Sequence, residues 1–331
     1  MNIITDLSHF EKERCPNLVV ALGNFDGLHL GHLKILEQIK TRARALGGRS
    51  AVFTFREHPQ RVLHQTENPP ILTSMVHKLY LLEQSGIDFC FLMDFTVSFS
   101  KKSPEDFVSE VFVEHLGARE VCMGFNARFG HDRSGDGSLM RKLAKRFGFE
   151  FLEVPPVEME NQVLSSSAIR ALVCSGRLEE AARWLGRRYS FFGTVVGGSG
   201  RGAGLGFPTA NLDPHNEVLP PEGVYAVWVK ILECQLVNHS DGTLTLESSV
   251  ERDQLEALLN YGKRPTFGAS QKPIPEVHVL DYEGSLKNRT VEVTVGKRLR
   301  EERIFADERA LGEQIERDME QGRAWFAQQT S

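Results

Sequence analysis

The first half of the chain alternates short apolar runs with segments whose apolar residues recur at helical spacing. The short runs fit buried strands at 18–25, 50–55, 87–93, 120–124 and 149–154. The segments with helical spacing lie at 33–45, 76–84, 104–115 and 139–147. Strands that alternate with helices indicate a parallel sheet with helices on both faces. In such sheets, ligands bind at the carboxyl ends of the strands.

The pattern changes after about Gly186. Glycines become dense, and short β-like runs at 191–196, 223–232, 276–282 and 290–295 are separated by Gly, Pro and Asn turn signals. This half therefore predicts an antiparallel sheet or small barrel. Residues 307–328 carry Leu311, Ile315 and Met319 on one face, which predicts a closing amphipathic helix. We expect an α/β protein with one domain at 1–186 and a second at 187–331.

Composition narrows the class of protein. The net charge of −5 gives no global basic field, so we expect no nucleic-acid partner. The five cysteines are scattered without a C-x-x-C pair, which fits reduced thiols in the cytoplasm. We recognise no signal peptide, and no apolar run approaches the roughly 20 residues of a membrane span.

The motif GNFDGLHLGH occupies 23–32, where a predicted strand passes into a predicted helix. The first turn of a helix has unpaired N–H groups and a partial positive charge, both of which favour an anion. Gly27 and Gly31 let backbone and ligand approach closely, while His29 and His32 share one side of the turn. Taken alone, the motif is equally compatible with a surface histidine pair at a helix start.

Three further motifs follow predicted strands and favour a phosphate site. TFREHP lies at 54–59, GFNARFG at 124–130 and LSSSAIR at 164–170. A serine run is most often a cap and turn. Here, however, three hydroxyls and Arg170 open a helix at the same expected edge of the sheet, where they would form a second side of a phosphate cradle.

The second half carries GGSGRGAGLGFPTANL at 197–212. Its glycines can wrap phosphates with backbone amides, although such loops taken singly are mostly turns and this one lacks a Walker-type Gly-Lys-Ser/Thr ending. Thr209 and Asn211 are two residues apart on a predicted extended chain, so their side chains point the same way. A hydroxyl and a carboxamide oxygen suit Mg²⁺ together with phosphates and waters.

The motifs of the first half resemble the adenylyltransferase half of the bacterial bifunctional riboflavin kinase/FAD synthetase family, a Rossmann-like H-x-G-H nucleotidyltransferase. The resemblance implies transfer of AMP from ATP to FMN, which yields FAD and pyrophosphate. It implies that His29, His32 and Arg170 are catalytic. The residues expected to bind ATP or its phosphates in this half are Gly23, Phe25, Gly27, Gly31, Asn126, Ser165, Ser166 and Ser167.

The second half resembles the riboflavin kinase domain of the same family, a small antiparallel barrel. The motifs that carry the resemblance are GSGRGAGLGFPTANL, PPEGVYA, NYGKRPTFG, PEVHVLD and LREERIF. The resemblance implies that Thr209 and Asn211 hold Mg²⁺ with ATP, and that Glu276 accepts the proton of the riboflavin 5′-hydroxyl. Gly200, Arg201 and Gly202 would contact the ATP phosphates, and His278 would be structural.

The chain departs from the family pattern in four places. Ser167 replaces a threonine, Ala127 an aromatic residue, and the segment at 285–288 a Tyr-Gly pair. The stretch at about 230–259 is longer than usual, and we expect it to form an extra hairpin followed by a short helix at 252–259.

The predicted activity is therefore phosphorylation of riboflavin followed by adenylylation of FMN. The expected partners are riboflavin, FMN, ATP and Mg²⁺, and the expected state is a monomer or weak homo-oligomer. Three alternatives stay open: an FMN adenylyltransferase without kinase activity, a flavin- or nucleotide-binding regulator without turnover, and an aminoacyl-tRNA synthetase-like activation domain. The acidic charge and the lack of a K-M-S-K-S-like loop disfavour the last.

Overall fold

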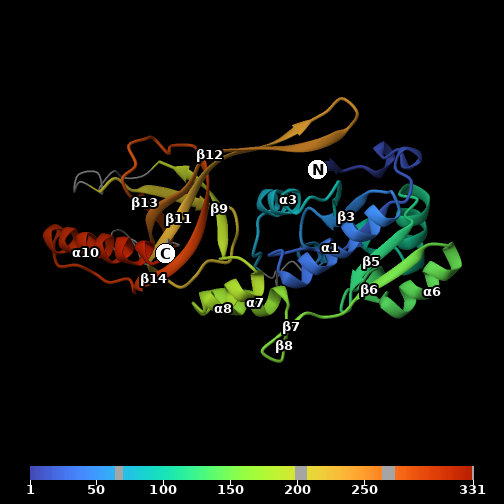
Figure 1. Cartoon of the computed structure of the whole chain (residues 1–331), viewed down its shortest axis with the longest axis horizontal. Coiled ribbons are helices and arrows are strands. Elements are labelled where there is room, and N and C mark those ends of the chain that lie inside the picture. Colours follow the sequence, from blue (N-terminus) through green and yellow to red (C-terminus); the bar gives the residue numbers. More distant parts are fainter. Residues whose placement is uncertain (64–69, 198–206, 263–272, 330–331) are drawn as a thin grey trace. The chain divides into compact units, whose positions relative to one another are not determined.

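The chain forms two compact units in a computed structural model that describes residues 1–63, 70–197, 207–262 and 273–329 (Figure 1). The first unit comprises 1–70, 75–166 and 235–247, and the second comprises 71–74, 167–234 and 248–331. The functional boundary at 186/187 stays a prediction.

A parallel sheet is the centre of the first unit. Its strands lie in the order β1-β4-β3-β2-β5-β6, and every neighbouring pair among them is parallel. Their bounds are β1 Asn2–Ile4, β2 Val19–Leu22, β3 Ser50–Phe55, β4 Phe89–Met93, β5 Glu120–Gly124 and β6 Glu150–Val154. All five strands predicted in this half are confirmed, while β1 was not foreseen because three residues are too few for a periodic signal.

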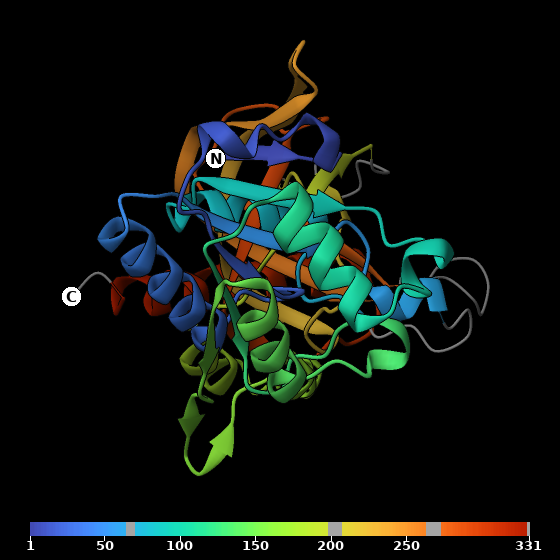
Figure 2. The same ribbon diagram turned by 90° about the vertical axis from the view of Figure 1, so that its right-hand side faces the viewer.

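Helices cover both faces of this sheet (Figure 2). On one face, Leu18, Val20 and Phe53 share a core with Phe112 and Met140 of the helical segments that follow β4 and β5. The helical segments are η1 Leu7–His9, η2 Lys12–Arg14, α1 Leu30–Ala45, α2 Pro59–Leu63, α3 Met75–Gln84, α4 Val97–Ser100, α5 Pro104–Phe107, η3 Val108–His115, η4 His131–Arg133 and α6 Gly137–Phe147. A small hairpin, β7 Glu158–Met159 and β8 Gln162–Val163, follows β6.

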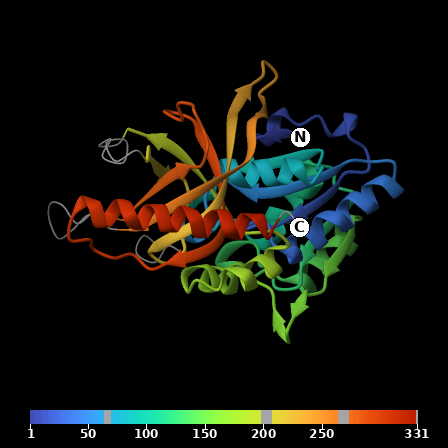
Figure 3. The same cartoon turned by 60° about the vertical axis from the view of Figure 1, so that its left-hand side comes forward.

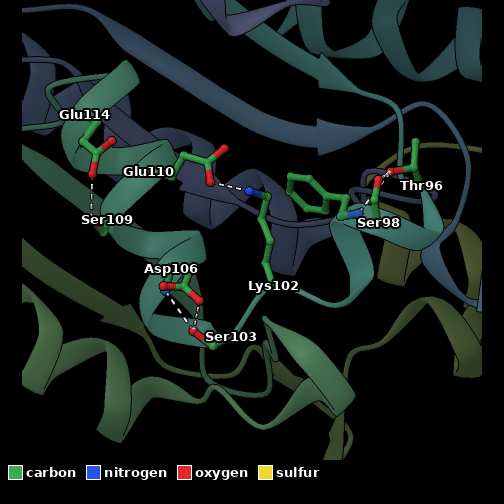
Figure 4. A network of polar contacts seen from close by, with 9 residues as sticks. Thr96, Ser98, Lys102, Ser103, Asp106, Ser109, Glu110 and Glu114 are labelled. Carbon is green, nitrogen blue, oxygen red and sulfur yellow. Dashed lines mark hydrogen bonds and ion pairs between the residues drawn. The ribbon is translucent and has the colours of Figure 1, made fainter.

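The helix predicted at 104–115 is present but changes type part-way. Ser103 caps α5 by accepting a hydrogen bond from the Asp106 amide at 3.1 Å, and after Phe107 the chain continues as the π-helix η3 (Figure 4). Phe107, Phe112 and Leu116, in and beside this π-helix, are all buried in the core of the first unit. The hydroxyl of Ser109 donates to Glu114, five residues on, across the same wide turn.

The second unit contains a closed antiparallel barrel, as predicted. Six strands pair in the order β11-β14-β9-β10-β13-β12, and β12 returns to β11. Their bounds are β9 Ser190–Val196, β10 Ala210–Pro214, β11 Gly223–Asn238, β12 Thr243–Gly262, β13 Ile274–Val279 and β14 Thr290–Arg300.

Helix α10 (Glu308–Ala327) packs along the outside of this barrel (Figure 3). Phe326 of α10 shares a core with Ala226 of β11, Leu258 of β12 and Leu280, which directly follows β13. The predicted closing helix is therefore confirmed. Two shorter helices, α7 Ser166–Cys174 and α8 Leu178–Leu185, precede the barrel.

The insertion forms a long hairpin of β11 and β12, as predicted, but the helix expected at 252–259 is wrong. Strand β12 runs through those residues without a break and pairs with β13 from Ala257 to Gly262. Pairing to β11 on one side and β13 on the other satisfies the backbone of β12, so tertiary context overrides the helix-forming sequence ERDQLEAL.

The tip of this hairpin belongs to the first unit. Thr243, Leu244 and Thr245 of β12 pair antiparallel with Ile4, Ile3 and Asn2 of β1. Strand β1 thus has β4 on one side and the hairpin tip on the other, so it is not an exposed sheet edge.

Candidate active sites

The GNFDGLHLGH segment connects β2 to α1 at the carboxyl end of the parallel sheet. Helix α1 begins three residues earlier than predicted, so His29 is its N-cap and His32 lies in its first turn. The Nδ1 atom of His29 accepts a hydrogen bond from the Gly31 amide at 3.1 Å. A ring nitrogen that accepts is unprotonated, so the proton of neutral His29 is on Nε2, which remains a donor.

The two histidines stack face to face. Their ring centroids are 3.7 Å apart and the ring planes differ by 19°. The buried ring of Phe25 lies 5.2 Å from the His32 ring and completes the apolar side of the stack. The prediction that the histidines share one side of the turn is confirmed, and both rings lie at the N-terminus of α1.

The glycines predicted at the site have clear geometric reasons. A Cβ atom on Gly31 would lie 3.0 Å from Cε1 of His29, and one on Gly23 would lie 3.1 Å from the Phe25 ring. Gly27 has a φ of +80°, which side chains rarely adopt. Only glycine fits these three positions without displacing the loop or the histidine stack.

The serine motif contacts this loop through one residue. The hydroxyl of Ser166, the first residue of α7, donates to the carbonyl oxygen of Asp26 at 2.9 Å. Arg170 donates to the hydroxyl of the exposed Ser167 at 3.2 Å, while Ser165 is half-buried. The pairing of Ser166 with the histidine loop confirms that these two motifs meet.

The other two motifs of this half lie at the ends of β3 and β5. The Nε2 atom of His58, in TFREHP, lies 3.3 Å from the side-chain amide nitrogen of Asn24 in the histidine loop. Asn126 is exposed in the turn after β5. Motifs that are far apart along the chain therefore lie at the same edge of the sheet.

Lys78, in α3, is a site residue that the sequence did not reveal. Its ammonium is buried and donates to the carbonyl oxygen of Phe55 at 2.8 Å. It also lies 3.5 Å from both the carbonyl oxygen of Asn24 and the hydroxyl of Thr54. The only sequence signal is a lysine within the apolar helix MVHKLYLL, which reads equally well as a surface position.

The second site is on the barrel. Glu276 of β13 lies directly opposite Asn211 of β10 on one side and opposite Asn260 of β12 on the other. Residues directly opposite each other in antiparallel strands point to the same face, so one carboxylate lies between two carboxamides. Asn260 was within a recognised motif but was not predicted as a site residue.

The residues around this carboxylate differ in exposure. Asn211 is buried, Thr209 is exposed just before β10, and Glu276 is half-buried. His278 shares the face of Glu276, and its Nδ1 lies 2.8 Å from the carbonyl oxygen of Pro208. This contact to the PTAN segment agrees with a structural role. Gly200, Arg201 and Gly202 lie outside the described residues.

The donor set of the barrel site fits a hard divalent cation bound together with phosphates. The side-chain amide nitrogen of Asn211 donates to the carbonyl oxygen of Gly197 at 3.4 Å, which orients the carboxamide. Hydroxyl, carboxamide and carboxylate oxygens are ligands that Mg²⁺ accepts. Within the described ranges, no three His, Cys, Asp or Glu side chains cluster as a metal site.

Comparison with known protein families matches both halves. The family model for FAD synthetase matches residues 11–168, and the model for riboflavin kinase matches residues 185–326. The first range contains both histidines and the three serines, and the second contains Asn211 and Glu276. Arg170 lies two residues beyond the first match.

Proteins named bifunctional riboflavin kinase/FMN adenylyltransferase are similar over nearly the whole chain. The Haemophilus influenzae protein is 31% identical, with 93% of this chain and 94% of the relative covered. The Bacillus subtilis protein is 31% identical (98% and 97% covered), and the Escherichia coli K12 protein 30% identical (98% and 96% covered). The chain belongs to this bifunctional family.

A solved structure is similar over nearly the whole chain. A crystal structure described as a macrolide-efflux protein from Streptococcus pneumoniae matches with a TM-score of 0.79 and 27% identity, covering 98% of this chain and 100% of the other. In the described part of the chain, every helix is too short or too polar to cross a membrane.

Proposed function

We propose that this chain converts riboflavin to FMN and then FMN to FAD, using ATP in both steps, at two separate sites. The observation that supports this best is that the two family models match different halves of one chain. The first matched range holds both histidines and the three serines, and the second holds Thr209, Asn211 and Glu276. We assign the adenylyltransferase domain to 1–186 and the riboflavin kinase domain to 187–331.

The first domain is proposed to be a Rossmann-like nucleotidyltransferase that transfers AMP to FMN. The FMN phosphate is already a nucleophile, so this reaction needs alignment and neutralisation of charge rather than a base. His29 and His32 would donate to phosphate oxygens beside the N-terminus of α1, where developing negative charge is stabilised. Ser165, Ser166, Ser167 and Arg170 would bind the phosphates from α7.

The stacked geometry supports this role. Because the Gly31 amide occupies Nδ1 of His29, the ring cannot rotate without losing a hydrogen bond, and its Nε2–H keeps one direction. A donor that is fixed before the substrate binds costs no reorganisation during the reaction.

The second domain is proposed to phosphorylate the 5′-hydroxyl of riboflavin. An alcohol becomes a better nucleophile when a positioned base accepts its proton, and Glu276 would supply that base. Thr209 and Asn211 would hold Mg²⁺ through their side-chain oxygens. When bound, the cation neutralises phosphate charge. Asn260, on the other side of Glu276, would orient the carboxylate.

We also place the enzyme in the cytoplasm. All five cysteines are free thiols, and burial raises the pKa of both Cys90 and Cys122 to about 12. Thiols with raised pKa values are poor nucleophiles and behave as inert core residues.

Product analysis tests the two-site proposal. The purified protein, riboflavin, ATP and Mg²⁺ should give FMN first and FAD later on chromatographic separation of the flavins. FAD from supplied FMN, but no FMN from riboflavin, would leave only the adenylyltransferase. Bound flavin without any product would favour a regulator and contradict the proposal.

Variants test the assignment of residues. We expect the double variant His29→Ala/His32→Ala to stop FAD formation and to retain FMN formation. Glu276→Ala should stop phosphorylation of riboflavin and still convert supplied FMN to FAD. A folded variant of either kind that lost both activities would overturn the separation of the two sites.

A further inference from the structure

A buried lysine lies behind the histidine loop. Lysine is almost never fully buried without partners, because removing its charge from water is costly. Lys78 has its partners in three oxygens: the Phe55 carbonyl at 2.8 Å, and the Asn24 carbonyl and Thr54 hydroxyl at 3.5 Å each. An ammonium has three donors, so this set can occupy all of them.

These partners belong to the ends of two parallel strands. Phe55 is the last residue of β3, and Asn24 is in the loop that follows β2. The hydroxyl of Thr54 also donates to the Asn24 carbonyl at 3.3 Å. Lys78 and Thr54 therefore hold the same carbonyl oxygen, one residue before Phe25.

The loop held in this way is strained. Phe25 has a φ of +53° and Leu28 a φ of +39°, in the left-handed region that non-glycine residues rarely adopt. Such conformations persist only where the surroundings fix them. In this loop they bury Phe25 beside the His32 ring and bring His29 to the start of α1.

We infer that Lys78 is a positioning residue for the adenylyltransferase site: its ammonium fixes the Asn24 carbonyl and thereby the loop that aligns His29 and His32. It touches neither histidine and acts through the backbone. Burial lowers the pKa of Lys78, whereas the nearby Cys90 thiol and the Asp26 carboxylate act in the opposite direction. The inference rests on the proposed function, because it concerns the same histidines.

The first test is Lys78→Met, which preserves length and removes the donors. We expect kcat for FAD formation from FMN to fall by about 100-fold, as for a misplacement of reacting groups by about 1 Å, with little change in KM for FMN. Riboflavin phosphorylation by the same preparation should be unchanged. The matched control is Lys142→Met on the exposed face of α6, which should leave both activities unchanged.

Coupling to His32 separates positioning from general support of the fold. If Lys78 acts through the histidine stack, adding Lys78→Met to the His32→Ala variant should lower the rate of FAD formation by less than about threefold. This rate is measured in single turnover with labelled ATP. An equal loss in both backgrounds, or no loss in the wild-type background, would overturn the inference.

A second variant covers the case in which Lys78→Met fails to fold. Thr54→Val keeps the shape of a fully buried side chain and removes the other donor to the Asn24 carbonyl. It should lower kcat for FAD formation several-fold, again without effect in the His32→Ala background. Wild-type kcat in Thr54→Val would contradict the inference.

Imidazole NMR gives a readout that is independent of turnover. Comparison with His32→Ala and His29→Ala assigns the two ring signals, and both should shift in Lys78→Met or Thr54→Val. Unchanged ring signals would overturn the positioning role even if activity fell. Absence of FAD formation by the wild type would instead refute the proposed function, so the two failures are distinguishable.

Discussion

At the scale of single residues, Gly31 determines where the His29 ring can lie. A Cβ atom there would be 3.0 and 3.1 Å from two atoms of that ring, and the ring is already held by the Gly31 amide and by the stack on His32. An alanine at this position would require the ring to move by a few tenths of an ångström from the place that these two contacts define.

Gly31→Ala should therefore lower FAD formation by about 10- to 100-fold without unfolding the protein, because alanine favours a helix while its methyl group displaces the ring. The prediction is checked by measuring the rates of FMN formation and FAD formation and the melting temperature of the variant. The control is Gly312→Ala in α10, where an added Cβ meets nothing within 4 Å. This control should stabilise the protein by about 0.5–1 kcal/mol and leave both rates unchanged. Normal FAD formation by Gly31→Ala would contradict the tight packing.

Sequence reasoning identified the residues whose local context is informative. His29 and His32 stand out because glycines and a helix start surround them, and their stacking follows from their spacing. Lys78 could not be predicted, since its partners are backbone carbonyls 23 and 54 positions away along the chain. Carbonyl oxygens carry no signature in the sequence, so the environment of this lysine depends on the sheet register.

At the scale of elements, one buried ion pair attaches α10 to β14. Arg300 contacts both carboxylate oxygens of Asp318, at 2.8–3.0 Å, and Gln314 donates to the same carboxylate at 2.7 Å. The side chain of Asp318 is only 4% exposed. Removing one partner of such a pair leaves a buried charge without compensation.

Asp318→Asn should reduce the free energy of unfolding by about 2–4 kcal/mol, measured by urea denaturation. Asp281→Asn, which breaks the exposed pair of Asp281 with Arg323, is the matched control and should leave stability close to that of the wild type. Equal effects of the two variants would show that burial of the Asp318 pair is unimportant.

Asp88 joins the starting ends of β3 and β4. Its carboxylate accepts hydrogen bonds from the Ser50 amide at 2.9 Å, the Ser50 hydroxyl at 2.6 Å and Arg49 at 3.1 Å. Burial acts to raise the pKa of Asp88, but these hydrogen bonds outweigh it, and the pKa is lowered. A lowered carboxyl pKa contributes stability above the unfolded value of about 3.9, and this stability is lost as pH falls through the folded value.

Asp88→Asn should thus reduce the free energy of unfolding by about 1 kcal/mol at pH 7. The expected effect is modest because the Asp88 side chain is 34% exposed. The difference from the wild type should shrink as the pH falls below about 4. Urea denaturation at several pH values measures both effects. A constant difference down to pH 2 would mean that ionisation of Asp88 does not contribute.

Helices and strands could be predicted where one hydrophobic pattern dominated a segment. They could not be predicted where neighbouring strands determined the conformation of the segment. The strand at 50–55 was predicted at its observed bounds, because a buried parallel strand has a short, mostly apolar sequence. The segment 252–259 was predicted wrongly as a helix, since charged residues of high helix propensity carry no trace of the strands that flank them. The change to a π-helix at Val108 was likewise invisible, because helical periodicity alone does not distinguish the two types.

At the scale of the whole molecule, the hairpin tip at 235–247 supplies a strand to the parallel sheet. Replacing it with a short turn, while keeping the paired stem, should leave β1 with one neighbour. We expect faster hydrogen–deuterium exchange at Ile3 and Ile4 and a greater tendency to aggregate. Unchanged exchange there would show that the tip does not protect β1.

The pairing of β1 with β12 also has a consequence for synthesis on the ribosome. Asn2 is among the first residues made, yet its partner Thr245 is made more than two hundred positions later. At about 5–20 residues per second, the first strand waits for roughly ten seconds or longer with one edge open. A nascent chain that stalls before Thr245 would therefore expose an edge that the finished protein covers, and chaperone binding would be needed most during that interval.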